Sequence, residues 1–296
     1  MGICKLLAGA TVTSIKKMKV VLYLWAINVV FALFALLPLC YLIDKNMSHS
    51  LMGDTLMGGV DHLWLGDMIY KVFHTGGGVL VAMLFAPLPA YLLLHIFLNG
   101  GIIGRLINRD AKVTLSRFFA DCGAYFGRFF RLFLLSIPAY LLSAALLYGM
   151  LSLIFGRFTR QAVTEWPRII AGNSKIVLFL LVFSWVNMFF DYVKIRLVAA
   201  DSRKICKATW FTAKLVAKRL FTAWGIYVLV GIANILFGVV FLEISNLLGS
   251  ATLWMVLLGF IWQQVFIFGR MFLRLSLLSA QVKLYTQCCP RAAHQL

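Results

Sequence analysis

The sequence predicts an all-α, polytopic membrane protein with six transmembrane helices, and three observations support that fold class. The 296-residue chain is 62% hydrophobic and only 13% charged, which is too apolar for an ordinary soluble domain. Its apolar residues gather in six runs of about 20 residues, the length that crosses a bilayer as a helix. Its formal net charge of +18 falls on one side once those runs are threaded through a membrane.

The apolar runs define the expected elements in chain order. The predicted spans cover residues 20–43, 79–98, 132–155, 176–195, 223–243 and 252–273. Basic, amphipathic segments between the spans predict interfacial helices over about residues 113–130 and 202–220. We expect a single membrane domain over residues 1–296.

The distribution of basic residues predicts the orientation. With the N-terminus in the cytoplasm, the cytoplasmic segments hold 22 of the 28 Lys and Arg residues and four of the ten acidic residues. The opposite side then carries no net charge, which is a strong positive-inside bias. The sequence therefore predicts a multi-pass membrane protein with both termini cytoplasmic.

An internal similarity predicts three hairpins in one orientation. Residues 97–133 align with residues 188–224 at an offset of 91, so that Arg105 matches Arg196 and Asp110 matches Asp201. A third Arg-Leu pair, Arg274-Leu275, follows the last span. We expect three parallel repeats about an axis along the membrane normal, each with a basic amphipathic segment before its hairpin.

The two interfacial segments place cations opposite apolar residues. In the first, apolar residues recur at helical spacing, and Arg117 and Asp121 are spaced to pair on the surface. The apolar residues are Leu115, Phe118, Phe119, Cys122, Phe126, Phe129 and Phe130. We expect the basic side chains of both segments to contact anionic phospholipids or a protein partner. These residues are Arg117, Arg128, Arg131, Arg203, Lys207, Lys214 and Lys218.

A few polar residues fall inside the predicted spans. His95, Asn99, Asp191 and Arg270 lie at roughly one depth, and ionisable groups at such depth are usually paired or functional. We expect them to form a buried polar cluster in which Asp191 pairs with Arg270. Lys194 and His95 are the alternative partners of Asp191. A structural clasp between helices is the favoured interpretation, and a proton- or ion-coupled site is the alternative.

Motifs for chemistry are missing from the sequence. It contains no HExxH, no GxSxG and no P-loop, and its cysteines have no CxxC spacing. We expect no enzymatic activity, no metal site and no cofactor. Nucleic acid is not an expected partner, because the basic residues lie in short loops beside membrane helices, where anionic lipid is nearer.

The six-span layout, with the segments RFFADCGAYFGRFFRLF and DYVKIRLVAADSRK, resembles a group of poorly characterised bacterial membrane proteins. That group includes the membrane domain of glycerophosphodiester phosphodiesterases. The resemblance implies a membrane module, and it supplies no active-site residues because the catalytic domain of such enzymes is absent from this sequence.

Together with that resemblance, these features favour a non-enzymatic scaffold or accessory subunit of a membrane assembly in the bacterial inner (cytoplasmic) membrane. Its expected partners are anionic phospholipids and other membrane or cytoplasmic protein subunits. The alternative is a transporter or permease subunit that works with a partner ATPase or a coupled ion.

Overall fold

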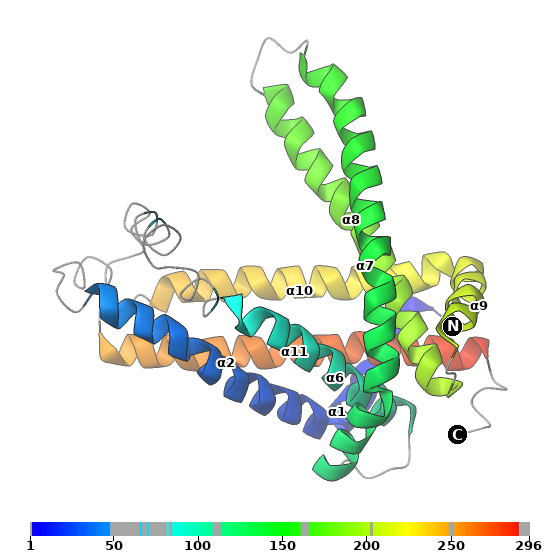
Figure 1. Ribbon diagram of the computed structural model, residues 1–296, viewed down its shortest axis with the longest axis horizontal. Helices are drawn as coiled ribbons and strands as arrows, with labels where there is room; N and C mark the ends of the chain where they lie inside the picture. The colour runs from blue at the N-terminus through cyan, green and yellow to red at the C-terminus, as the bar shows by residue number, and fades with distance from the viewer. Residues whose placement is uncertain are drawn as a thin grey trace. The chain divides into compact units, whose positions relative to one another are not determined.

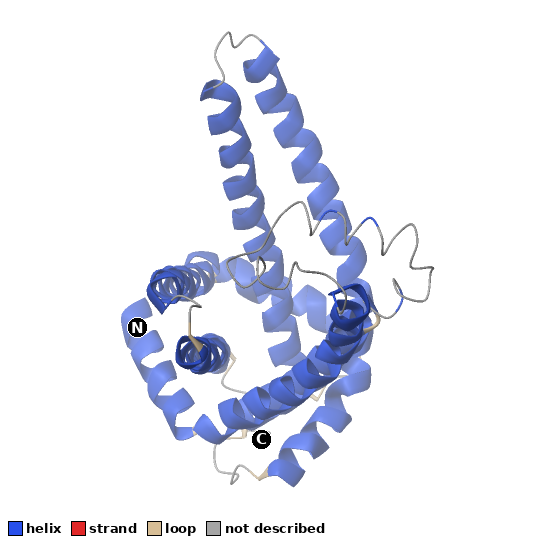
Figure 2. Cartoon of the chain, turned by 90° about the vertical axis from the view of Figure 1, so that its left-hand side faces the viewer, coloured by secondary structure: helices blue, strands red, loops and turns tan. Residues whose placement is uncertain are grey.

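The computed structural model describes residues 2–47, 66, 70, 82, 85–108, 114–160, 166–201, 204–248 and 252–289. Within these residues the chain forms eight helices and no strand (Figures 1 and 2). The helices are α1 (Ile3–Lys16), α2 (Met18–Met47), α6 (Pro87–Ile107), α7 (Leu115–Arg160), α8 (Trp166–Ala199), α9 (Ile205–Lys218), α10 (Leu220–Leu248) and α11 (Leu253–Cys288). The predicted all-α fold class is confirmed.

Six of these helices are long and apolar enough to cross a membrane, which confirms a multi-pass membrane protein. The candidate spans are Met18–Pro38, Pro87–Ile107, Leu115–Gly156, Gly172–Ala199, Leu220–Leu248 and Leu253–Cys288. Pro87 and Pro89 lie in the first turn of α6, where a missing amide donor breaks no helical hydrogen bond.

The two interfacial segments differ in how they join the span that follows. The first is not a separate helix, because α7 runs without a break from Leu115 to Arg160. The second is separate: α9 ends at Lys218, and Arg219 has φ −130° and ψ 30° before α10 begins. The segment predicted over residues 113–130 is therefore continuous with the span that follows it, whereas α9 is a separate helix within residues 202–220.

The chain divides into two compact units, which are described separately. The first unit comprises Met1–Ser14, Asn99–Val230 and Ser276–Leu296, and the second comprises Ile15–Leu98 and Gly231–Leu275. The long helices α6, α10 and α11 contribute to both units.

The core of the first unit is formed by the C-terminal parts of α6, α8 and α11. Every residue from Asn99 to Ile107 is buried, and so is every residue from Ser276 to Val282. In α8 the residues Phe190, Asp191, Tyr192 and Val193 are buried in succession. A helix that is buried on all sides must be enclosed by other helices.

Three amphipathic segments of the first unit each pack a narrow stripe of residues against this core. The stripe consists of residues four apart: Leu6, Ala10 and Ser14 in α1, Phe118 and Cys122 in α7, and Ala208, Thr212 and Val216 in α9. Such spacing keeps side chains on one face of a helix. The apolar face of each segment is therefore used for packing within the protein.

The remainder of α7 runs side by side with α8 (Figures 1 and 2). The Tyr140 and Phe183 rings join the two helices, with centroids 5.0 Å apart. Leu141, Leu146 and Leu153 on α7 are exposed, as expected of side chains that face lipid.

The second unit is held by aromatic packing and one side-chain hydrogen bond. Trp25 on α2 donates from Nε1 to Oε1 of Gln264 on α11 at 3.1 Å. The Phe241 and Phe266 rings stack with centroids 4.1 Å apart, which joins α10 to α11. A Cβ atom on Gly269 would lie 2.6 Å from the Phe237 ring, so these helices approach closely there.

Candidate functional site

Four polar residues of α8 form a stripe along one face of this membrane helix. Ser184, Asn187, Asp191 and Lys194 follow one another at spacings of three, four and three residues, which places them on one side of the helix. Polar groups in a membrane helix favour positions where another helix supplies a partner. We call these four residues the α8 polar stripe.

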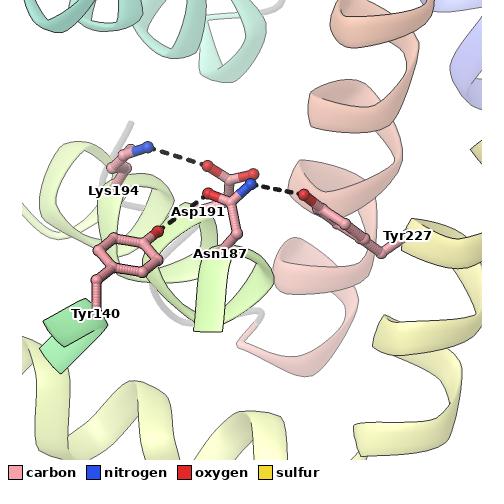
Figure 3. Close-up of polar contacts among 5 residues, drawn as sticks. All are labelled: Tyr140, Asn187, Asp191, Lys194 and Tyr227. Carbon is pink, nitrogen blue, oxygen red and sulfur yellow. Dashed lines mark hydrogen bonds and ion pairs between the residues drawn. The ribbon is translucent and has the colours of Figure 1, made fainter. Parts of the chain in front are cut away.

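Asn187 connects three helices at the centre of the α8 polar stripe (Figure 3). The Tyr140 hydroxyl on α7 donates to Asn187 Oδ1 at 3.2 Å, and Asn187 Nδ2 donates to the Tyr227 hydroxyl on α10 at 2.6 Å. One turn earlier, Trp224 on α10 donates from Nε1 to the Ser184 hydroxyl at 3.3 Å. The stripe therefore faces both α7 and α10.

Asp191 is the most deeply buried ionisable residue of the stripe. Its side chain has 0% exposure, and its Oδ1 lies 3.0 Å from Lys194 Nζ on the next turn of the same helix (Figure 3). A buried carboxylate is strongly disfavoured unless a cation or hydrogen-bond donors compensate it. Lys194, which keeps 22% exposure, supplies that compensation.

The residues of the predicted polar cluster fall in both units. Asn99 and Asp191 are buried in the first unit, whereas His95 and Arg270 are exposed in the second. The His95 ring lies 6.4 Å from the Tyr91 ring, and the Arg270 guanidinium lies 5.7 Å from the Phe266 ring centroid. Asp191 pairs with Lys194, one of its two alternative partners, and its pairing with Arg270 stays a prediction.

An ion pair fixes the start of α7 on α6. Arg105 donates from Nε to Oδ2 of Asp121 at 2.6 Å, although its side chain is 5% exposed. Asp121 was expected to pair with Arg117 on its own helix, but its ion pair is with Arg105. Gly101 allows the approach, because a Cβ atom there would lie 2.5 Å from Cys122 Sγ and 2.7 Å from the Phe118 ring.

A second basic residue, Arg196, fixes α9 on α8. Its guanidinium carbon lies 3.6 Å from the centroid of the Phe211 ring on α9, a cation–π contact. Its Nη1 also donates to the hydroxyl of Tyr285 on α11 at 3.3 Å.

A third basic residue, Lys283, fixes α1 on α11. Its ammonium group donates to the Gly9 carbonyl oxygen. The hydroxyls of Ser14 and Ser279 form a second contact at 3.1 Å between the same two helices. Each amphipathic segment of the first unit is thus held by a basic side chain near the C-terminal end of a long helix. We call the three contacts of Arg105, Arg196 and Lys283 the basic clamps.

Comparisons with protein-family models, with curated proteins and with solved structures gave no match. The site is therefore interpreted from its own geometry.

The predicted lipid or partner face largely points away from the core. Arg117, Arg131, Lys207, Lys214 and Lys218 are exposed. Arg128 is partly buried and its Nη1 lies 2.5 Å from Oδ1 of Asp201, which is two positions beyond the end of α8 and has φ 42°. Arg203 lies outside the described residues.

Sequence reasoning did not find the hydrogen-bonding residues Tyr140, Asn187 and Tyr227. The signal was the spacing of Asn187 from Asp191, which places an amide one turn from a carboxylate on the same face. Within the described parts of the chain, no group of three or more His, Cys, Asp or Glu residues is placed to hold a metal ion. The chemistry available at the α8 polar stripe is hydrogen bonding and ion pairing.

Proposed function

We propose that this chain is a non-enzymatic scaffold or accessory subunit of a larger assembly in the bacterial inner membrane. Both termini and the amphipathic segments lie on the cytoplasmic side, where the positive-inside bias puts the excess of Lys and Arg. The basic faces of these segments contact anionic phospholipids or a protein partner.

The observation that carries this proposal is the way α1, the start of α7 and α9 are held. The basic clamps and the buried stripes attach each segment to the protein through one face. Each segment therefore presents its other face outward in a fixed position. Exposed cations on that face include Lys5 in α1, Arg117 in α7 and Lys214 in α9. A rigid, basic surface of this kind suits recognition better than catalysis.

We also infer that the chain contains three copies of one structural unit. Arg105 contacts the segment that follows α6, and Arg196 contacts the segment that follows α8. Lys283 contacts α1, which closes the cycle. Each cation precedes a leucine, so Lys283-Leu284 supports a register in which Lys283 takes the place proposed above for Arg274.

The amphipathic segments support the same repeat. The buried residues Leu6, Ala10 and Ser14 of α1 match Ala208, Thr212 and Val216 of α9 at an offset of 202. At the same offset, the break in the helix at Lys17 matches the break at Arg219. Replacing Lys283 with methionine should lower stability as much as Arg105→Met does.

Co-purification tests the scaffold function. The full-length protein is purified from its own host in a mild detergent, and the accompanying chains are identified by mass spectrometry. We expect a protein partner to co-purify, and we expect its amount to fall when Arg117→Gln and Arg131→Gln are combined. The amount should not change with Lys175→Gln, because Lys175 lies on the opposite side of the membrane in the proposed topology. A monodisperse, partner-free protein with catalytic turnover would overturn the proposal.

A transporter or permease subunit is the second candidate, favoured by the α8 polar stripe. Asn187, Asp191 and Lys194 could line a path through the membrane region, and the amphipathic helices would couple to an ATPase. In liposomes, Asp191→Asn should then abolish flux. Flux that is unchanged by this substitution would exclude Asp191 from any transport mechanism.

A further inference from the structure

The outward side of α9 differs from the other exposed surfaces of the amphipathic segments. Lys207, Trp210, Lys214 and Lys218 follow one another at spacings of three, four and four residues, and all four are exposed. This spacing puts them on one side of the helix, opposite the buried Ala208, Thr212 and Val216. We call these four residues the outer face of α9.

The position of α9 in the chain keeps this face close to a membrane. Only residues 200–204 separate α9 from the candidate span Gly172–Ala199, and only Arg219 separates it from the candidate span Leu220–Leu248. A helix joined so closely at both ends to membrane-crossing helices stays at the membrane surface. Its buried stripe faces the protein, so its outer face can meet lipid headgroups without unfolding.

The chemistry of the outer face matches an anionic headgroup layer. Trp210 is 68% exposed, which is unfavourable for an indole in water but typical of the membrane interface. Lys214 Nζ lies 5.4 Å from the centroid of the Trp210 ring, so the ring holds a cation beside it. No acidic residue occurs in α9 to neutralise its lysines.

The start of α7 provides a contrast within the same unit. Its outward residues Arg117 and Arg131 are exposed cations, but the positions between them on that side are Ala120, Ala124 and Gly127, without an aromatic ring. This surface has charge without the interfacial aromatic residue, and that difference distinguishes it from the outer face of α9.

We propose that the outer face of α9 binds anionic phospholipids, with Lys207, Lys214 and Lys218 on headgroup phosphates and Trp210 at the level of the glycerol backbone. This proposal deepens the proposed function. It rests on the proposed function only for placing the bound lipids in the inner leaflet.

A lipid titration of the purified full-length protein in detergent tests the proposal. Bound phosphatidylglycerol and bound phosphatidylcholine are counted by native mass spectrometry as each lipid is added. We expect the wild-type protein to prefer phosphatidylglycerol. Lys214→Gln should weaken phosphatidylglycerol binding about fivefold, which corresponds to the ~1 kcal/mol that one basic residue contributes near an anionic surface.

Four further variants make the result specific. Replacing Lys207, Lys214 and Lys218 together with glutamine should abolish the preference for phosphatidylglycerol, and replacing them together with arginine should retain it. Trp210→Leu should weaken binding of both lipids alike. Lys175→Gln, which lies on the opposite side of the membrane in the proposed topology, should leave the preference intact, and the lipid-free melting temperature confirms that each variant folds.

Two results would overturn the proposal. The first is an unchanged preference for phosphatidylglycerol in the triple glutamine variant. The second is unchanged lipid binding in that variant, together with the loss of an acidic protein from the co-purification experiment. That result would assign the outer face of α9 to a protein partner. The lipid titration contains only purified protein and lipid. A failure to find a protein partner by co-purification would therefore contradict the scaffold function but would not change the outcome of the lipid titration.

Discussion

Asn187 donates to the Tyr227 hydroxyl at 2.6 Å while it accepts from the Tyr140 hydroxyl at 3.2 Å. One amide on α8 thus connects α7 to α10 at membrane depth. A side-chain hydrogen bond between membrane helices typically contributes about 0.6 kcal/mol, and seldom more than about 2 kcal/mol. The contribution is small, but it fixes the rotation of three helices about their axes.

The first prediction concerns this hydrogen-bonded group. Tyr227→Phe should lower the free energy of unfolding by about 1 kcal/mol, and Tyr140→Phe by less, because its hydrogen bond is longer. Thermal unfolding in detergent measures both effects. Tyr148→Phe is the matched control, since Tyr148 is exposed on α7 and should be neutral. Equal melting temperatures for all three variants would contradict the assigned hydrogen bonds.

The second prediction concerns the Asp191–Lys194 ion pair. Lys194→Met leaves a fully buried carboxylate without its cation and should destabilise by about 3 kcal/mol, as in other broken buried pairs. Asp191→Asn should have a smaller effect, because the partly exposed ammonium group can turn toward the aqueous interface. The double variant should recover much of the loss.

A double-mutant cycle on the melting temperature measures this coupling. Additive effects at Asp191 and Lys194 would show that the two groups do not stabilise each other. A second cycle with Arg270→Met tests the pairing that the sequence predicts between Asp191 and Arg270, which has its own coupling energy if it forms.

The third prediction concerns the close approach at Gly101. A Cβ atom at this position overlaps Cys122 Sγ and the Phe118 ring, so Gly101→Ala should destabilise by about 1 to 3 kcal/mol through overpacking. Gly123 lies on α7 with open space around it, and Gly123→Ala should stabilise by about 0.5 to 1 kcal/mol. Opposite signs in the two melting shifts are the expected result, and equal shifts would refute the close packing of α6 on α7.

The fourth prediction joins topology to burial. Single-cysteine variants that retain Cys122 or Cys206 should resist a membrane-impermeant thiol reagent in intact cells, because both thiols lie on the cytoplasmic side in the proposed topology. After lysis, Cys206 should react quickly because it is exposed, and Cys122 slowly because it has 0% exposure. Labelling of Cys206 before lysis would reverse the assigned orientation.

The sequence predicted the helices well because their signals are local. Runs of apolar residues identify membrane-crossing helices. The helical spacing at the start of α7 identified Phe118, Cys122 and Phe129, which are buried, but also Leu115 and Phe119, which are exposed. The same spacing could not show what covers them. The Phe118 ring lies against α6 where Gly101 has no side chain.

The contacts of the candidate site were harder to predict because they depend on how helices rotate and which faces meet. Arg105 and Asp121 lie on different helices, so helical periodicity favoured Arg117 as the partner of Asp121. Asp191 and Lys194 lie on one helix at a spacing of three residues, and that pair was among the sequence-based alternatives. No local sequence pattern indicates that Asn187 would form hydrogen bonds with Tyr140 and Tyr227, because both tyrosines lie on other helices.

The contact between Lys283 and the Gly9 carbonyl oxygen joins residues 274 positions apart. The ribosome synthesises α1 long before the end of α11. The contact that holds α1 therefore cannot form while the helices between them are being inserted. The contact therefore forms only after Lys283 has been synthesised. A product truncated before Ser279 would lack both polar contacts that join α1 to α11, and its less tightly held amphipathic helix would be open to proteolysis.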